Sequence, residues 1–247
     1  MKSLLLMSAA LATLALTTLA QAEDKPVYEL RIYTTNEGKL PNLNARFRDH
    51  TAPLFEKHGM TNIGYWTPTD PALKDNTLIY ILKHDSPAAA KKSWAAFMAD
   101  PDWVKAKTAS EADGKLVSKA ESVYMTETDF SPHNLENGDQ ERLFELRKYT
   151  CDPGRLPNLH KRFRDGELDL FTKAGMTHIA YFTPTETPDT LIYIVAHKDA
   201  ADAAKSWDAF RTNPEWIKMK ADSRADGPIV TKVESTMMVP VDYSALK

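Results

Sequence analysis

Two short stretches of the chain place a carboxylate, a guanidinium group and a phenol at alternate positions. The two sets are Glu29, Arg31 and Tyr33, and Glu145, Arg147 and Tyr149. Alternate residues of a β-strand point to the same face, so each set shares one strand face. An arginine can hold a carboxylate through two parallel hydrogen bonds. Both sets are therefore candidates for binding an acidic or carbonyl-bearing small molecule.

The same charged residues also have a structural interpretation. Between them stand Tyr28, Leu30 and Ile32, which form the apolar face of the first strand. If that face meets a layer of helices, the charged face points into the space between two sheets. Buried charges must be paired, so the charged residues there would either bind a ligand or join the sheets as an ion-pair network. We favour the network, because charged clusters of this kind are often structural.

His50 is the candidate for a general base. An imidazole titrates close to neutral pH, which suits proton transfer. Asp49 stands beside it, and Gly166 occupies the matching position of the second stretch. Any chemistry of His50 would therefore belong to one part of the chain only.

Several other kinds of site are not indicated. The seven histidines include no pair four positions apart and no His-Glu-x-x-His run, so no metal site is expected. A glycine-rich phosphate loop and a Gly-x-Ser-x-Gly turn are also missing from the sequence. The only cysteine, Cys151, has Thr35 as its counterpart, so the repeated design does not need a thiol. We expect no cofactor.

A further charged pair recurs near the end of each stretch. The pairs are Lys119 with Glu121, and Lys232 with Glu234. Both members of a pair share one strand face. They either extend the first charged cluster or protect an edge strand with solvated charge, and we favour the second interpretation.

These recurrences belong to a repeat that covers most of the chain. Leu40-Pro41-Asn42-Leu43 returns as Leu156-Pro157-Asn158-Leu159, a shift of 116 positions, and Lys92-Ser93-Trp94 returns as Lys205-Ser206-Trp207, a shift of 113. Solenoid and propeller repeats run about 20–50 residues, so this period indicates a duplicated domain.

The apolar spacing predicts the same elements in each copy. In the first copy it predicts strands over 27–34, 61–67, 77–84 and 116–126, a helix from Leu40 to Gly59, and two helices that begin near Ser86-Pro87 and Asp100-Pro101. The order strand-helix-strand, strand-helix-strand is the split βαβ unit of a ferredoxin-like domain.

We therefore expect an α+β protein with two tandem ferredoxin-like domains. They span residues 26–132 and 141–245, with a polar linker over 133–140. Such a sheet has helices on one face only and must cover the other. Two sheets packed face to face would form an α/β barrel within one chain, as a dimer does between two. The chain is then a monomeric pseudo-dimer or part of a larger homo-oligomer.

The residues of both copies resemble the NIPSNAP family. The resemblance rests on the stretches Tyr28–Tyr33, Phe47–Gly59 and Thr126–Pro132, and on Trp94 with Phe97. The second copy departs from the pattern, with Gly166 in place of His50 and Asp169 in place of Pro53. The resemblance implies the dimeric α/β-barrel superfamily, whose members include cofactor-free monooxygenases and haem proteins, but it implies no particular reaction.

The first 22 residues have the pattern of a secretory signal peptide. Lys2 supplies a positive charge, Leu4 to Leu16 is apolar, and Ala20-Gln21-Ala22 fits a cleavage site. The apolar part is shorter than the roughly 20 residues of a membrane span. We expect a periplasmic or secreted protein with no membrane span after signal removal. The net charge of −3 on 247 residues makes nucleic acid an unsuitable partner.

Besides a purely structural assembly protein that uses its outer sheet edges or helices as contacts, the sequence leaves two functions open. The first is binding of a small molecule or a protein partner through the barrel. The alternative is a cofactor-independent monooxygenase or isomerase that acts on a small carbonyl or aromatic substrate, with Arg31 or Arg147 stabilising an enolate and His50 or a tyrosine moving the proton. That mechanism requires His50 or Tyr33 to point into a cavity.

Overall fold

A computed structural model of the chain describes residues 25–132, 134–135 and 141–247. The expected signal peptide and most of the expected linker lie outside the described residues. Among the described helices, none combines the length and the apolar composition of a membrane span.

Each half of the chain follows the predicted order of elements. The first half comprises β1 (Val27–Thr35), α2 (Leu40–Arg46), η1 (Phe47–Thr51), α3 (Ala52–Lys57), β2 (Thr61–Pro68), β3 (Thr77–His84), α4 (Pro87–Ala99), α5 (Pro101–Ser110) and β4 (Val117–Glu127). The second half comprises β5 (Leu143–Cys151), α6 (Leu156–Arg162), η2 (Phe163–Glu167), α7 (Leu168–Lys173), β6 (Thr177–Pro184), β7 (Thr190–His197), α8 (Ala200–Thr212), α9 (Pro214–Ser223) and β8 (Val230–Pro240).

The long helix predicted from Leu40 to Gly59 contains a π-helical turn that the sequence pattern did not indicate. This turn, η1, separates α2 from α3, and η2 separates α6 from α7 in the second half. In η2 the chain passes through Gly166 with a φ of +146°, a value open to glycine and strained for other residues. His50 therefore lies in a π-turn and not in a regular helix.

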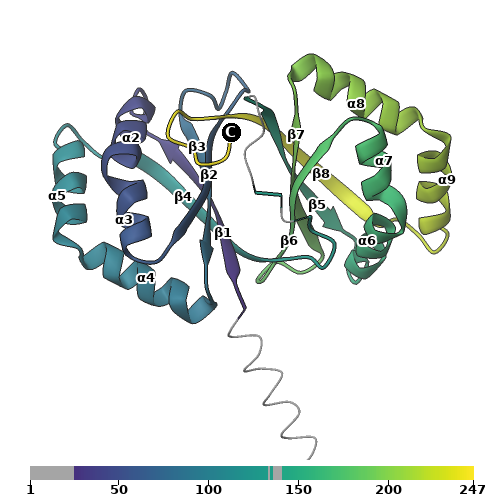
Figure 1. Cartoon of the computed structure of the whole chain (residues 1–247), viewed down its shortest axis with the longest axis horizontal. Coiled ribbons are helices and arrows are strands. Elements are labelled where there is room, and N and C mark those ends of the chain that lie inside the picture. The colour runs from purple at the N-terminus through teal and green to yellow at the C-terminus, as the bar shows by residue number, and fades with distance from the viewer. Residues whose placement is uncertain (1–24, 133, 136–140) are drawn as a thin grey trace, which may run out of the picture.

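The eight strands form one closed barrel. The first half contributes the order β4-β1-β3-β2 and the second half β8-β5-β7-β6, and the pairs β2–β8 and β4–β6 close the ring. All the strand pairs are antiparallel. Figure 1 shows the strands in the centre with the helices of each half on the two outer sides. The predicted intramolecular α/β barrel is therefore confirmed.

Apolar side chains fill the inside of the barrel. Tyr28 and Leu30 of β1 pack there against residues of the second half such as Phe144 and Phe182. An eight-stranded barrel is just wide enough for its own side chains. A ligand is therefore better sought outside the barrel wall than between the sheets.

We expected Glu29, Arg31 and Tyr33 to point into the space between the sheets, and this expectation is wrong. Tyr33 packs against the core beneath the helices of the first half, and its two partners share its strand face. The same correction holds for Glu145, Arg147 and Tyr149, because Tyr149 belongs to the core beneath the helices of the second half. The apolar faces of β1 and β5 point into the barrel, because the barrel interior has few hydrogen-bond donors for a charged group.

The segments that follow β4 and β8 cross to the opposite half. After β4, Ser131 Oγ accepts a hydrogen bond from the backbone N–H of Tyr181, at 3.1 Å. After β8, Ser244 Oγ accepts one from the backbone N–H of Tyr65, at 2.9 Å. The segment after the last strand of each half is therefore hydrogen-bonded to the other half. These two contacts add to the strand pairs that close the barrel.

We predict that Ser244→Ala lowers the free energy of unfolding by about 1–3 kcal/mol, because it leaves the buried N–H of Tyr65 without its partner. Urea unfolding followed by circular dichroism measures the change. Thr108→Ala on the exposed surface of α5 is the control, with no comparable loss expected. A Ser244→Ala protein as stable as the control would show that this crossing does not hold the halves together.

Candidate functional site

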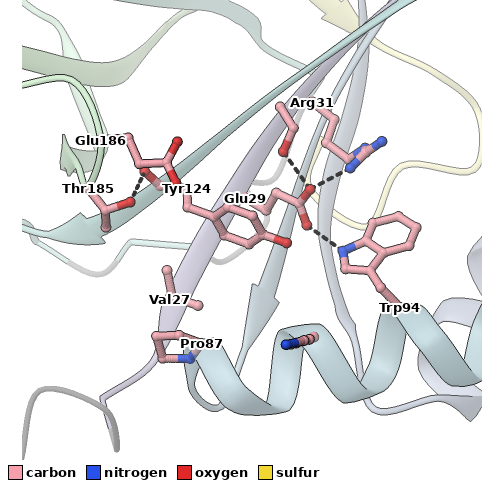
Figure 2. Close-up of a pocket in the computed structure, with 10 residues that line it drawn as sticks. Val27, Glu29, Arg31, Pro87, Trp94, Tyr124, Thr185 and Glu186 are labelled. Carbon is pink, nitrogen blue, oxygen red and sulfur yellow. Dashed lines mark hydrogen bonds and ion pairs between the residues drawn. The ribbon is translucent and has the colours of Figure 1, made fainter.

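The charged face of β1 is built around the carboxylate of Glu29. This residue is buried, with 1% of its surface exposed. Arg31 Nη1 and Ser122 Oγ donate to its Oε1 at 2.5 and 2.7 Å. Trp94 Nε1 donates to its Oε2 at 2.7 Å, and His84 Nε2 lies 3.1 Å from the same oxygen. Figure 2 shows Glu29 between Arg31 and Trp94. The carboxylate therefore links four elements: β1, β3, α4 and β4.

This environment keeps Glu29 ionised. Burial by itself raises the pKa of a carboxyl group. Hydrogen bonds from His84 and Ser122 and the charge of Arg31 outweigh burial and lower the pKa of Glu29 to about 2. An ionised carboxylate only accepts hydrogen bonds, so His84 Nε2 carries the proton in this contact. Glu29 is thus a fixed anion at neutral pH.

Arg31 is held between aromatic rings as well as by Glu29. Its guanidinium carbon lies 4.6 Å from the ring centre of Trp94 and 5.2 Å from that of Tyr33. Its Nη2 donates to Tyr33 Oη at 3.0 Å. Burial by itself lowers the pKa of Arg31, but Tyr80, Tyr33 and Glu29 together keep it above its usual value. The guanidinium is therefore permanently charged and held in one orientation.

The second half repeats this arrangement contact by contact. Glu145 accepts hydrogen bonds from Arg147 Nη1 at 2.5 Å, Ser235 Oγ at 2.6 Å and Trp207 Nε1 at 2.5 Å, and His197 Nε2 lies 3.1 Å away. Burial raises the pKa of Glu145, but these contacts lower it to about 2. The predicted pairing of Glu with Arg is present in both halves. It ties strands to helices within each half, whereas we expected it to join the two sheets.

Sequence reasoning did not include the histidine, tryptophan and serine partners in the site. The signal was present, because His84 with His197 and Trp94 with Trp207 occupy matching positions. A buried tryptophan N–H also requires an acceptor. Ser122 and Ser235 also occupy matching positions, since each directly follows the recurring Lys-x-Glu pair.

An open cavity of about 800 Å³ adjoins the Glu29–Arg31 pair of the first half. It lies between β1, β4 and the start of α4, and residues that follow β6 reach it from the second half. Its lining comprises Val27, Glu29, Arg31, Pro87, Lys91, Trp94, Ser122, Tyr124, Thr185 and Glu186. Figure 2 shows Tyr124 facing Glu29, with Thr185 and Glu186 beyond it. We name this space the first-half pocket.

Two polar residues of this lining have apolar counterparts in the second half. Ala204 stands where the first half has Lys91, and Met237 stands where it has Tyr124. The first-half pocket therefore combines a shared anion–cation pair with an ammonium group and a phenol that the other half lacks. Because Tyr124 is not repeated, a search for shared residues could not find it.

Tyr124 is held in its neutral form. Burial and the nearby carboxylate of Glu29 raise the pKa of Tyr124 to about 12. Its backbone carbonyl accepts a hydrogen bond from the backbone N–H of Thr185 at 2.8 Å. The phenol is thus a hydrogen-bond donor at neutral pH, on a strand that is fixed by the opposite half.

The other candidate residues lie away from this pocket. His50 is exposed on η1 and is not part of the pocket lining. Lys119 pairs with Glu121 at 2.6 Å, and Lys232 with Glu234 at 2.9 Å, and all four side chains are about half exposed or more. They are solvated ion pairs and do not extend the buried cluster.

Comparison with protein-family models identifies the family of this chain. The NIPSNAP family model matches residues 28–132 and again residues 144–245. The chain belongs to the NIPSNAP family. A search among curated proteins finds no match.

Solved structures of the same architecture cover nearly the whole NIPSNAP chain. A proposed monooxygenase from Lactobacillus acidophilus NCFM has a TM-score of 0.55 at 12% identity, covering 87% of this chain and 94% of its own. A proposed monooxygenase from Fusobacterium nucleatum subsp. nucleatum ATCC 25586 has a TM-score of 0.58 at 10% identity, covering 88% and 93%. An anthrone oxidase-like protein has a TM-score of 0.53 at 14% identity, covering 91% and 95%. At these identities the likeness concerns the fold.

We predict that Glu29→Gln destabilises the protein by about 3–5 kcal/mol, because it leaves Arg31 buried without its counter-charge. Glu145→Gln should have a similar effect through Arg147. Urea unfolding at neutral pH measures both. Glu37→Gln in an exposed turn is the control, and a loss no larger than that of the control would contradict the central role of the carboxylate.

The pH dependence of stability follows from the lowered pKa values. The folded-state pKa of Glu29 is about 2, below its usual 4.5, and Glu145 behaves alike. Their contribution is therefore fully present above about pH 4.5 and is lost as the pH falls from 4.5 towards 2. We expect urea midpoints measured across this range to fall less steeply in the double Gln variant than in the unmodified protein. Equal slopes would contradict the assignment.

Proposed function

We propose that the first half of this NIPSNAP protein binds a small carbonyl- or carboxylate-bearing molecule in the first-half pocket. The observation that carries the proposal is the placement of Lys91 and Tyr124 beside the fixed Glu29–Arg31 pair. Both are donors that the second half replaces with Ala204 and Met237. Such a difference between the copies, next to a framework that both copies share, is the arrangement expected of a ligand site.

The lining fits a compact ligand with an apolar body and a polar end. Trp94, Val27 and Pro87 supply apolar surface, and ligand sites are mostly apolar with a few placed polar groups. The ammonium of Lys91 and the phenol of Tyr124 supply the donors. A volume of about 800 Å³ lies within the usual range of small-molecule sites.

The same groups support binding more than acid–base catalysis. A general base works best with a pKa near the operating pH. The pKa of Glu29 is about 2 and that of Tyr124 about 12, so neither group exchanges a proton readily near neutrality. The monooxygenase or isomerase mechanism required His50 or Tyr33 inside a cavity. His50 is exposed, and Tyr33 lines a different cavity of about 390 Å³ and not the first-half pocket. We therefore do not extend the oxidase or monooxygenase assignments of the structural neighbours to this chain.

Native mass spectrometry of the protein after incubation with mixtures of small metabolites tests the binding proposal. We expect one adduct that carries a carbonyl or carboxylate group. Lys91→Ala and Tyr124→Met, which copy the second half, should each weaken binding about tenfold or more, because a hydrogen bond to a charged group contributes about 1.5–3 kcal/mol.

Lys92→Ala is the matched control, since Lys92 is the exposed neighbour of Lys91 and does not line the pocket. It should bind as the unmodified protein does. The proposal is overturned if no adduct forms, or if the adduct survives unchanged in both pocket variants.

We also propose that the chain is exported to the periplasm or secreted, on the basis of its first 22 residues. Cleavage after Ala22 would leave Glu23 as the new N-terminus. Because signal cleavage needs small residues at this point, Ala22→Asp should accumulate the uncleaved form. Fractionation of bacterial cells and N-terminal sequencing of the product measure both effects. A product in the cytoplasm that still begins at Met1 would contradict export.

A further inference from the structure

A second cavity lies in the other half of the molecule, beneath α9 and beside the π-turn η2. Its volume is about 190 Å³. Its charged and aromatic lining consists of Tyr149, Arg162, Glu167, Trp216, Lys220 and Arg224. Three of these residues are cations and one is an anion, so the cavity carries an excess of positive charge.

The first half shows how the matching cavity is neutralised from within. There Arg46 stands in the position of Arg162, and Glu111 in the position of Arg224. Arg46 Nη1 donates to Glu111 Oε1 at 3.1 Å and to Ser110 Oγ at 3.2 Å. A carboxylate from the end of α5 thus occupies the terminal nitrogen of the buried guanidinium.

The second half lacks that carboxylate. Arg162 is 6% exposed, and its Nε donates to Glu167 Oε2 at 2.7 Å. Its terminal Nη atoms make no hydrogen bond to any residue that the structure describes. Arg224 adds a second cation where Glu111 closes the first half, and Lys220 lies with its Nζ 5.9 Å from the ring centre of Trp216. The buried guanidinium therefore keeps free donors. Arg162 lines this cationic cavity and also a neighbouring cavity of about 560 Å³ whose lining includes Asp165 and Asp222.

We propose that this second-half cavity binds the carboxylate of a small organic acid. The carboxylate takes the place that the Glu111 side chain holds in the first half, between the Nη atoms of Arg162 and the cations Lys220 and Arg224 at the end of α9. A guanidinium and a carboxylate match in planar geometry and can form two parallel hydrogen bonds. Glu167 does not compete for this position, because it occupies the Nε side of the same guanidinium.

The size of the cavity restricts the ligand. One water molecule occupies about 30 Å³ of liquid, so 190 Å³ holds roughly six waters or an acid with few carbon atoms. This site is separate from the first-half pocket in position and in lining. Ligand binding at one site therefore neither supports nor contradicts ligand binding at the other.

Malonate is a suitable probe, because it is a small dianion without other recognition groups. We expect it to shift the indole N–H signal of Trp216 in ¹H–¹⁵N NMR spectra of the intact protein. Malonamide, which has a similar shape but no charge, should leave the signal in place. Arg224→Glu restores the charge arrangement of the first half and should weaken malonate binding about tenfold or more. Lys220→Ala should weaken it less, because this exposed side chain supplies one cation at the rim.

Lys205→Glu is the control, since it makes the same charge change at an exposed position of α8 outside this cavity. The proposal is overturned if malonate does not move the Trp216 signal, if malonamide moves it equally, or if Arg224→Glu binds as tightly as the Lys205→Glu control. Malonate that shifts Trp94 but not Trp216 would also overturn it, while supporting the first-half pocket.

Discussion

A buried, ionised glutamate on the central strand of each half organises this molecule. Glu29 is surrounded by donors from its own strand, a neighbouring strand on each side, and the helix that covers them. Removing a carboxylate from water is costly unless its oxygens find partners. The positions of β3, β4 and α4 relative to β1 are therefore tied to one side chain, which also holds the Trp94 ring 4.6 Å from the guanidinium carbon of Arg31.

Because the domain is duplicated, the same set of buried contacts occurs twice in the chain, each time with different residues around it. The carboxylate, its arginine and its tryptophan are kept in both halves, so each half retains its internal ties. Around them the lining has diverged, with Lys91 and Tyr124 in the first half, and Arg224 in place of Glu111 in the second. Both halves fold around the same kind of buried carboxylate. The first-half pocket and the second-half cavity nevertheless differ in size and charge.

The closed barrel explains why these cavities lie on its outside. Strand pairs β2–β8 and β4–β6 bring the two apolar sheet faces together, and packed side chains such as Trp66 and Phe144 fill the interior. The first-half pocket and the second-half cavity both lie where helices meet the outer strand faces. The first-half pocket also receives Thr185 and Glu186 from the opposite half, so its lining is complete only when both copies are present.

The sequence by itself determined the duplication, the order of elements in each half, the α/β barrel and the recurring Glu-x-Arg-x-Tyr face, because periodicity and repetition are local properties. It did not determine which strand face looks inward. Both faces of a central strand are buried, and only the donors brought by His84 and Trp94 place Glu29 on the helix side. The surroundings of Tyr124 were likewise decided by tertiary packing, since Thr185 and Glu186 of the same pocket are distant along the chain.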